Sequence, residues 1–264
     1  MSTATAPTRR VVYDHPALLA ERSTHYCPGC GHGTVHRLLA EVLGELDVGA
    51  RTIAVAPVGC AVFAYDYLRL DFVEAPHGRA PAVATGIRRV RPDAFVLTYQ
   101  GDGDLAAIGT AEIVHAAARA ERITAVFVNN GTYGMTGGQM APTTLLGQRT
   151  TSTPLGREAS ETGYPLPITE MLAVLPGVAY AARGTLADPG SVGKVKAMLR
   201  RACEIQLADA GFAIVEVLSN CPVGWGMTPT ESIAHLAEVA TTYPVGVLVD
   251  RPRGVGTQTE TTRA

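Results

Sequence analysis

The sequence predicts an α/β fold in which a mainly parallel sheet carries helices on both faces. Apolar runs of strand length at residues 94–99, 123–128 and 212–218 alternate with longer stretches of helical apolar spacing. Strands that alternate with helices pair in parallel, because each helix returns the chain to the start of the next strand. We therefore expect a single domain over residues 1–264, with irregular tails at about 1–14 and 252–264.

The same periodicities predict the individual elements in chain order. Leucine and valine at helical spacing predict a helix over 34–46, and a strand is expected at 51–56. A turn at 76–79 precedes a predicted helix over 80–90. The later elements are the strand 94–99, a helix over 105–120, the strand 123–128, a helix within 186–208, the strand 212–218 and a short helix at 229–240. Residues 136–167 are rich in threonine, glycine and proline, and so long a loop in a compact domain is usually functional.

Composition bounds the classes of function. The chain has 264 residues, of which 47% are hydrophobic and 17% charged, so a packed globular domain is expected. A net charge of −2 gives no electrostatic basis for binding nucleic acid. Residues 1–10 carry no apolar leader, and no segment reaches the ~20 apolar residues of a membrane span. We expect a cytoplasmic protein without membrane partners, whose thiols stay reduced.

The most informative residues follow two neighbouring strands. Gly101-Asp102-Gly103-Asp104 comes directly after strand 94–99, and Asn129-Asn130 ends strand 123–128. The carboxyl ends of parallel strands meet at the edge where open α/β sheets bind ligands. Glycine allows close approach to a phosphate, and the next helix adds N–H donors. Asp102 would repel a bare phosphate, so a hard cation such as Mg²⁺, which takes carboxylate, amide and phosphate oxygens, is expected between them.

This arrangement resembles the motif of thiamine-diphosphate enzymes, in which Gly-Asp-Gly is followed at a distance by Asn-Asn. The resemblance implies that Asp102, Asn130 and the backbone carbonyl of Thr132 bind Mg²⁺. The alternative is a dinucleotide-binding turn, because the glycines and Ala106 also fit the loose G-x-G-x-x-G/A pattern. A nicotinamide site, however, expects an acidic residue where the asparagine pair stands.

Four of the five cysteines form a second pattern. Cys27 and Cys30 make a C-x₂-C pair, and Cys60 and Cys221 each follow a predicted strand. Four converging thiolates in a reduced compartment suit either a [4Fe–4S] cluster or a structural zinc ion. A thioredoxin-like pair is a further alternative, but it leaves the two later cysteines unexplained. Cys203 lies within a predicted helix and is interpreted as an ordinary buried thiol.

Several motifs, taken in order, resemble the β subunit of 2-oxoacid:ferredoxin oxidoreductases over about residues 24–250. They are Tyr26-Cys27-Pro28-Gly29-Cys30-Gly31-His32-Gly33, Val58-Gly59-Cys60, Pro76-His77-Gly78-Arg79-Ala80, Gly101-Asp102-Gly103-Asp104 and Tyr133-Gly134-Met135-Thr136-Gly137-Gly138-Gln139. The last run most resembles the 2-ketoisovalerate and 2-oxoglutarate members. The resemblance implies a thiamine-diphosphate-binding fold.

The resemblance also implies the cofactors and the residues that hold them. Besides thiamine diphosphate and Mg²⁺, that family's β subunit binds one [4Fe–4S] cluster. The implied cluster ligands are Cys27, Cys30, Cys60 and Cys221. The backbone segments that would contact the cofactor are Gly59, Cys60 and Ala61, Gly103 and Asp104, and Gly134 and Met135. His77 and Arg79 lie on a turn at the same edge, where a substrate carboxylate or a phosphate is a possible contact.

The activity implied by the resemblance is the oxidative decarboxylation of a 2-oxoacid to acyl-CoA and CO₂, with electrons passed to ferredoxin. In that family the α subunit supplies the glutamate that activates the thiamine ring, so we expect an αβ or (αβ)₂ assembly. Glu41, Glu45 and Glu112 lie on predicted helices and are interpreted as solvated. The alternatives are a non-oxidative thiamine-dependent decarboxylase and a non-catalytic iron–sulfur or metal-binding electron-transfer module.

Overall fold

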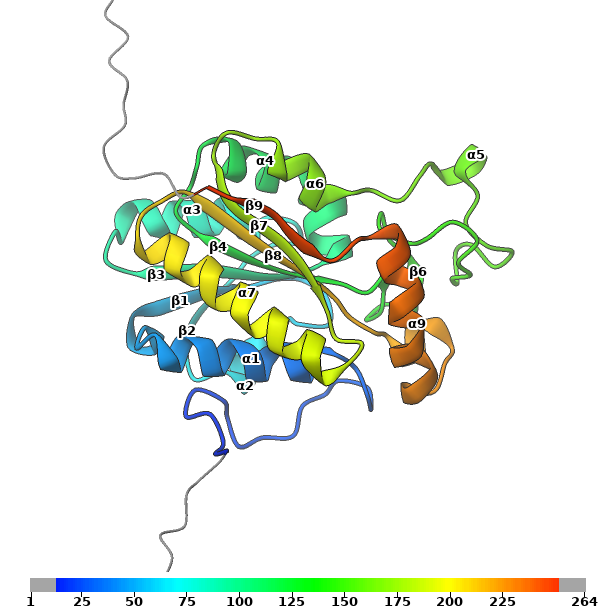
Figure 1. The fold of residues 1–264 in the computed structure, drawn as a ribbon, viewed down its shortest axis with the longest axis horizontal. Coiled ribbons are helices and arrows are strands. Elements are labelled where there is room, and N and C mark those ends of the chain that lie inside the picture. The colour runs from blue at the N-terminus through cyan, green and yellow to red at the C-terminus, as the bar shows by residue number, and fades with distance from the viewer. Residues whose placement is uncertain (1–12, 252–264) are drawn as a thin grey trace, which may run out of the picture.

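The computed structural model describes residues 13–251, so the predicted tails lie almost wholly outside the described residues. Its centre is a seven-stranded sheet in the order β2-β1-β3-β4-β8-β7-β9 (Figure 1). The strands are β1 (Thr52–Ala56), β2 (Asp71–Glu74), β3 (Phe95–Gly101), β4 (Thr124–Asn129), β7 (Val178–Thr185), β8 (Phe212–Leu218) and β9 (Gly246–Asp250). Every neighbouring pair is parallel except β7 and β9. The predicted mainly parallel sheet is confirmed.

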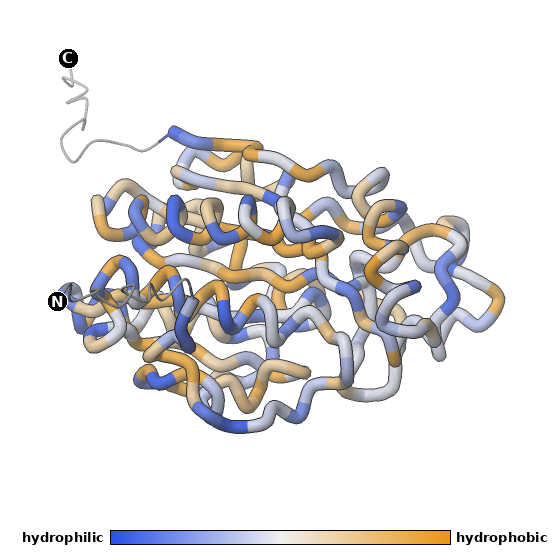
Figure 2. Tube along the Cα trace, turned by 60° about the horizontal axis from the view of Figure 1, so that its bottom comes forward, coloured by the Kyte–Doolittle hydropathy of each residue, from blue (hydrophilic) through white to orange (hydrophobic). Residues whose placement is uncertain are grey.

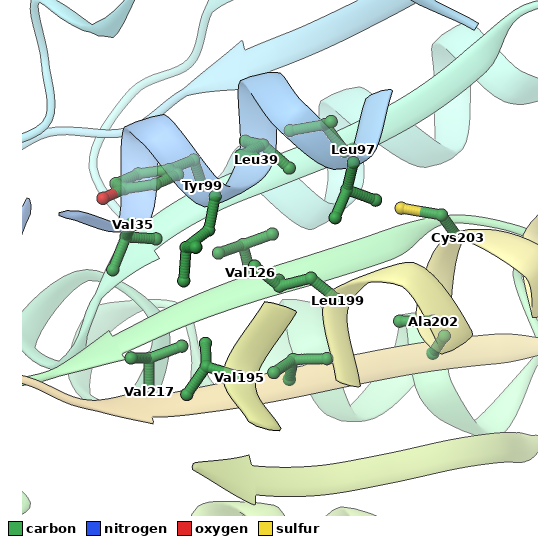
Figure 3. Packing of buried hydrophobic residues seen from close by; sticks show 14 of the residues in the cluster. Val35, Leu39, Leu97, Tyr99, Val126, Val195, Leu199, Ala202, Cys203 and Val217 are labelled. Atoms are coloured by element: carbon green, nitrogen blue, oxygen red, sulfur yellow. The ribbon is translucent and has the colours of Figure 1, made fainter. Parts of the chain in front are cut away.

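Helices cover both faces of this sheet, as predicted. On one face lie α1 (His32–Glu45) and α7 (Pro189–Leu207), and on the other α3 (Ala80–Val90), α4 (Thr110–Ala118) and α6 (Ile168–Ala173). Successive residues of β4 alternate between the two resulting cores, since strand side chains point to opposite faces. Val126 packs with Leu39 and Leu199 in the first core (Figure 3), whereas Phe127 lies in the second. Apolar stretches, drawn in orange, run through the interior of the chain trace (Figure 2).

The remaining elements lie around the ends of the strands. They are α2 (Ala64–Tyr67), the two-stranded sheet of β5 (Thr132–Tyr133) and β6 (Gln139–Met140), α5 (Ala159–Thr162), α8 (Pro222–Trp225), α9 (Pro229–Thr242) and a short 3₁₀ turn at Gly49–Arg51. The capping box of Thr228 and Glu231 starts α9, and Pro229 follows at its first turn. Within residues 13–251, no helix is both long and apolar enough to cross a bilayer.

The helix predicted over 105–120 differs at its start. The chain first forms a wide π-type turn over Gly103–Ile108 and becomes α-helical only at Thr110. A Cβ at Gly109 would lie 2.5 Å from the carbonyl oxygen of Asp104 and 2.8 Å from that of Gly78. The turn that carries Gly78 therefore packs directly against the wide turn. Widened helical turns are frequent at functional sites.

The long segment predicted as a loop does contain little regular structure, and one guanidinium organises it. Arg157 is buried. Its side chain donates to the carbonyl oxygens of Pro142, Thr144, Thr162, Gly163 and Tyr164 over 2.5–3.3 Å. These bonds satisfy carbonyls that have no ladder partner, as buried backbone requires. The segment projects beyond the carboxyl ends of the strands (Figure 1).

Candidate functional site

A pocket lies where β1, β3 and β4 end. Its cavity volume is about 120 Å³. The lining residues are His32, Pro57, Val58, Gly59, Cys60, Ala61, His77, Gly101, Asp102, Gly103, Asp104, Asn130, Thr132, Tyr133, Gly134, Met135 and Thr136. The structure thus brings together residues from five separate segments at the sheet edge that the sequence indicated.

Asp102 lies at the start of the wide turn and is almost fully buried. Its Oδ1 accepts a hydrogen bond from the backbone N–H of Gly103, and its Oδ2 accepts one from the hydroxyl of Thr143, each at 2.8 Å. Burial raises the pKa of this carboxyl to about 6, although the hydrogen bonds work in the opposite direction. No cationic side chain of the described residues offsets the charge, so the site suits a bound cation.

Asn130 and Thr132 line the same pocket as Asp102 and carry further oxygen atoms. Asn130 Oδ1 accepts from the N–H of Thr132 at 3.2 Å, and the indole N–H of Trp225 donates to the Asn130 carbonyl at 2.9 Å. Carboxylate, amide and carbonyl oxygens are the ligands that Mg²⁺ takes, with phosphate oxygens and water completing the shell. The donor set and the uncompensated carboxylate therefore fit a divalent cation.

Asp104 fixes the loops that surround the pocket. Its Oδ1 accepts from His77 Nδ1 at 2.6 Å, from the N–H of Gly78 at 2.9 Å and from the N–H of Val58 at 3.3 Å. Its Oδ2 accepts from the side-chain amide of Gln100. One buried carboxylate thereby joins β3 to the loops that follow β1 and β2. The sequence pointed to the backbone of Asp104; this role of its side chain was missed.

His77 and Arg79 occupy different places. His77 lines the pocket with its Nδ1 held by Asp104. Arg79 is not among the lining residues. Its guanidinium forms an ion pair with Glu112 at 2.7 Å and donates to the carbonyl of Ile108 at 2.9 Å. The structure therefore brings only the histidine of this pair to the pocket and uses the arginine to attach the turn to the helix region beyond it.

The four cysteines outside α7 converge next to the pocket. A Cβ placed on Gly134 would lie 3.3 Å from the sulfurs of both Cys60 and Cys221, which are 161 residues apart in the chain. Burial and, to a smaller extent, the charges of Cys30 and Cys27 raise the pKa of Cys60 to about 11 and that of Cys221 to about 12. A metal binds such thiols as thiolates, so its charge has to compensate theirs.

No three His, Cys, Asp or Glu side chains within residues 13–251 stand close enough to share one metal ion. A zinc ion would bind all its thiolates at one point, whereas each thiolate of a [4Fe–4S] cluster would bind a different iron atom. The chemistry of the four thiols suits either kind of centre.

Comparison with known proteins identifies the family. The family model for the C-terminal TPP binding domain of thiamine pyrophosphate enzymes matches residues 47–217. The 2-oxoglutarate synthase subunit KorB of Methanocaldococcus jannaschii is 38% identical over 234 residues, which cover 85% of this chain and 82% of that protein. The chain belongs to the family of 2-oxoacid:ferredoxin oxidoreductase subunits.

Two further comparisons extend this assignment. The ketoisovalerate oxidoreductase subunit VorA of Methanothermobacter thermautotrophicus is 50% identical over 211 residues, 80% of this chain but 44% of that protein. The chain thus spans less than half the length of this relative. The 2-oxoglutarate:ferredoxin oxidoreductase of Magnetococcus marinus, solved with 2-oxoglutarate, coenzyme A and succinyl-CoA, superimposes with a TM-score of 0.74 at 27% identity. That match covers 88% of this chain and 83% of the other.

Some residues of this oxidoreductase subunit's site carried no signal in the sequence. Thr143 binds Asp102 from 41 positions away, and the chain's one tryptophan, Trp225, reaches Asn130 from 95 positions away. Neither belongs to a motif of fixed spacing. The threonine content of the long loop marked Thr143 as a polar residue without indicating its partner.

Gly103 gives a testable consequence for the packing of this subunit's pocket. A Cβ there would lie 2.1 Å from a ring carbon of Tyr133, whose hydroxyl donates to the Gly103 carbonyl. We expect Gly103→Ala to displace the ring and lower the free energy of unfolding by about 1–3 kcal/mol, as overpacking does. Urea denaturation measures this. Gly86→Ala is the matched control, because it meets no atom within 4 Å on helix α3 and is expected to stabilise by about 0.5–1 kcal/mol. Equal stability of the two variants would contradict the packing argument.

Proposed function

We propose that this chain is the thiamine-diphosphate and [4Fe–4S] subunit of an oxidoreductase that oxidatively decarboxylates a 2-oxoacid to acyl-CoA and CO₂, with ferredoxin as electron acceptor. A branched-chain 2-oxoacid or 2-oxoglutarate is the proposed substrate, in keeping with the names of the relatives. One observation carries the proposal. Gly134 lines the pocket and at the same time lies against the sulfurs of Cys60 and Cys221, so the cofactor pocket and the cysteine cluster share a wall.

The cofactor is proposed to bind through both backbone and side chains. Asp102, Asn130 and the carbonyl of Thr132 would hold Mg²⁺ against the diphosphate. The backbone segments that would contact the cofactor are Gly59, Cys60 and Ala61, Gly103 and Asp104, and Gly134 and Met135, all of which line the pocket. When bound, thiamine diphosphate supplies an electron sink for the loss of CO₂ from a 2-oxoacid. The chain's own contribution is to orient the cofactor and compensate its charge.

The cluster is proposed to be held by Cys27, Cys30, Cys60 and Cys221. Cys60 and Cys221 follow β1 and β8. The loop of Cys27 and Cys30 lies against the end of β8, where the side-chain amide of Asn220 donates to the Gly29 carbonyl at 2.8 Å. A cluster bound by Cys60 would stand next to Gly59, on the loop proposed to contact the cofactor. Transfer of single electrons from the cofactor to the cluster requires that the two lie close together.

His77 is proposed to contact a substrate carboxylate or a cofactor phosphate. Asp104 accepts from its Nδ1, which leaves Nε2 as the nitrogen free to meet a ligand. The sequence also indicated Arg79 as a contact for this ligand. Such a contact would require Arg79 to break its ion pair with Glu112. The proposal therefore rests on the histidine.

Partner chains are part of the proposal. No glutamate is among the residues lining the pocket in the described part of the chain, and Glu41, Glu45 and Glu112 are each held in ion pairs with basic side chains. We propose that an α subunit supplies the activating glutamate in an αβ or (αβ)₂ assembly and that CoA is the acyl acceptor. The isolated chain would then show no turnover of 2-oxoacids.

The test is the metal and cofactor content of protein purified without oxygen. We expect about four iron and four acid-labile sulfide per chain, the composition of one [4Fe–4S] cluster, together with magnesium-dependent binding of thiamine diphosphate. Addition of the partner subunit should then allow a 2-oxoacid to reduce ferredoxin. Zinc, or no metal at all, in protein that still binds the cofactor would replace this proposal with a non-oxidative decarboxylase. Iron without cofactor binding would favour an electron-transfer module.

A further inference from the structure

A buried ion pair lies behind the pocket without lining it. Arg183 on β7 and Glu216 on β8 stand opposite each other in the register of the two strands, and their side chains are 0% and 1% exposed. The guanidinium Nε donates to Glu216 Oε2 at 2.7 Å. Buried pairs are often no more stabilising than apolar residues of the same volume. The role of the Arg183–Glu216 pair is therefore inferred from the residues that it contacts.

The pair is well compensated within the core. Glu170 forms two hydrogen bonds of 2.6 Å with the Arg183 guanidinium, and Thr169 donates to Glu216 Oε2 at 2.5 Å. Burial works to lower the pKa of Arg183, but the hydrogen bonds with Glu170 and the charges of both glutamates raise it above its ordinary value. Both groups of the pair are therefore fixed in position.

A first branch runs from Glu216 to the asparagine turn. The side-chain amide of Asn129 donates to Glu216 Oε1 at 2.7 Å, which determines which way this amide points. Asn129 Oδ1 then accepts from the N–H of Gly131 at 3.2 Å. Gly131 has a φ of +65°, so this bond shapes the tight turn that presents Asn130 to the pocket.

A second branch runs from Arg183 to Asp102. The guanidinium carbon lies 5.1 Å from the centre of the Tyr243 ring, within cation–π range. The Tyr243 hydroxyl donates to the carbonyl of Thr143 at 2.9 Å, and the Thr143 hydroxyl donates to Asp102 Oδ2 at 2.8 Å. Both side chains proposed to bind magnesium are therefore connected to the same buried pair.

We propose that Arg183 and Glu216 are positioning residues that set the geometry of Asn130 and Asp102 for the magnesium diphosphate group. The inference rests on the proposed function, because it gives these two side chains a shared ligand. The charge on Glu216 selects one orientation of Asn129, and Arg183 keeps that charge compensated where water cannot. Groups that orient metal ligands typically change metal affinity by about 10–100-fold when they are removed.

The test compares variants of the full-length protein, purified without oxygen, by equilibrium dialysis of thiamine diphosphate against increasing Mg²⁺. Asn129→Ala cuts the first branch and leaves the bond between Arg183 and Glu216 in place. We expect it and Glu216→Gln to raise the Mg²⁺ dissociation constant about 10–100-fold, with iron content unchanged. Tyr243→Phe, which cuts the second branch, is expected to raise it less. Glu121→Gln is the matched control, since Glu121 is also a buried glutamate in ion pairs with arginines, Arg89 and Arg119, but belongs to neither branch, and it should leave the constant within about twofold.

A double-variant cycle separates positioning from a purely structural role. If the pair acts through Asn129, the variant with both Asn129→Ala and Glu216→Gln binds Mg²⁺ as weakly as Asn129→Ala alone. A structural role would lower the unfolding midpoint of each variant and leave the Mg²⁺ dissociation constant at the wild-type value, and that result would overturn the inference. If Glu216→Gln does not fold, the Mg²⁺ dissociation constants of Asn129→Ala and Glu121→Gln still decide the question. Wild-type protein that binds no thiamine diphosphate with Mg²⁺ would instead overturn the proposed function.

Discussion

Replacing Asp102 with asparagine is expected to abolish magnesium-dependent binding of thiamine diphosphate and to leave the iron–sulfur content unchanged. The substitution removes the one carboxylate of the proposed ligand set, so the loss should exceed the ~100-fold that indirect changes at metal sites reach. The protein should still fold. An asparagine Oδ1 can accept from the N–H of Gly103, and the Thr143 hydroxyl can rotate to accept from the new amide. Equilibrium dialysis and iron analysis on the same sample measure both outcomes.

A second aspartate supplies the control for this experiment. Asp66 lies on helix α2 and forms an ion pair with Arg22 on the outside of the molecule. Asp66→Asn makes the same chemical change outside the pocket, so cofactor binding should be that of the wild type. Retained cofactor binding in Asp102→Asn would remove the carboxylate from the ligand set and with it the main argument for a thiamine site.

Replacing Cys60 or Cys221 with alanine is expected to remove the cluster. Each change takes away one of four thiolates that hold it, and iron and sulfide should fall from about four of each to below about one per chain. The charge-transfer absorption between sulfur and iron should disappear with them. Cys203→Ala is the control, because this thiol is buried among the apolar residues between α1 and α7 (Figure 3). That variant should keep a full complement of iron.

Comparison of Cys221→Ala with Cys203→Ala also shows whether iron is lost because a ligand is missing or because the protein unfolds. Thermal unfolding of the apo protein should be similar for Cys221→Ala and Cys203→Ala, since both thiols are buried and each loses one sulfur atom. Iron retained in Cys221→Ala would exclude this residue as a ligand and leave three cysteines for the cluster. Loss of iron from Cys203→Ala would mean that iron content reports on folding and not on ligation.

The elements that the sequence predicted best have a clear apolar pattern, either along one face of a helix or throughout a buried strand. The helix expected over 80–90 and the strand expected over 212–218 have the observed bounds of α3 and β8. Three strands of the seven-stranded sheet were not predicted, for different reasons. The edge strand β2 has charged ends and an exposed surface, β7 carries Arg183 and Gly184 near its carboxyl end, and β9 is short and half-exposed. Their strand form depends on neighbours that are distant in sequence.

The same distinction holds for the site. Asp102, Asn130, Cys60 and Cys221 were found because they directly follow strands, and parallel strands place their carboxyl ends at one edge. No comparable rule predicts which loop residues will reach the site. Tyr243 and Thr143, for example, lie 100 positions apart and meet through one hydroxyl. Arg183 was not a candidate at all, because a charged residue in a central strand contradicts the apolar pattern on which strand prediction depends.

The buried guanidinium of Arg157 has a consequence for how a ligand is received. Its bonds to five carbonyl groups tie the long segment that carries Thr143 together through contacts within the chain itself. Ordering a flexible segment around a ligand would cost about 0.5–1.5 kcal/mol for each immobilised side chain. Here that entropy is already lost when the chain folds. The segment is therefore a preformed support for Asp102, which Thr143 contacts.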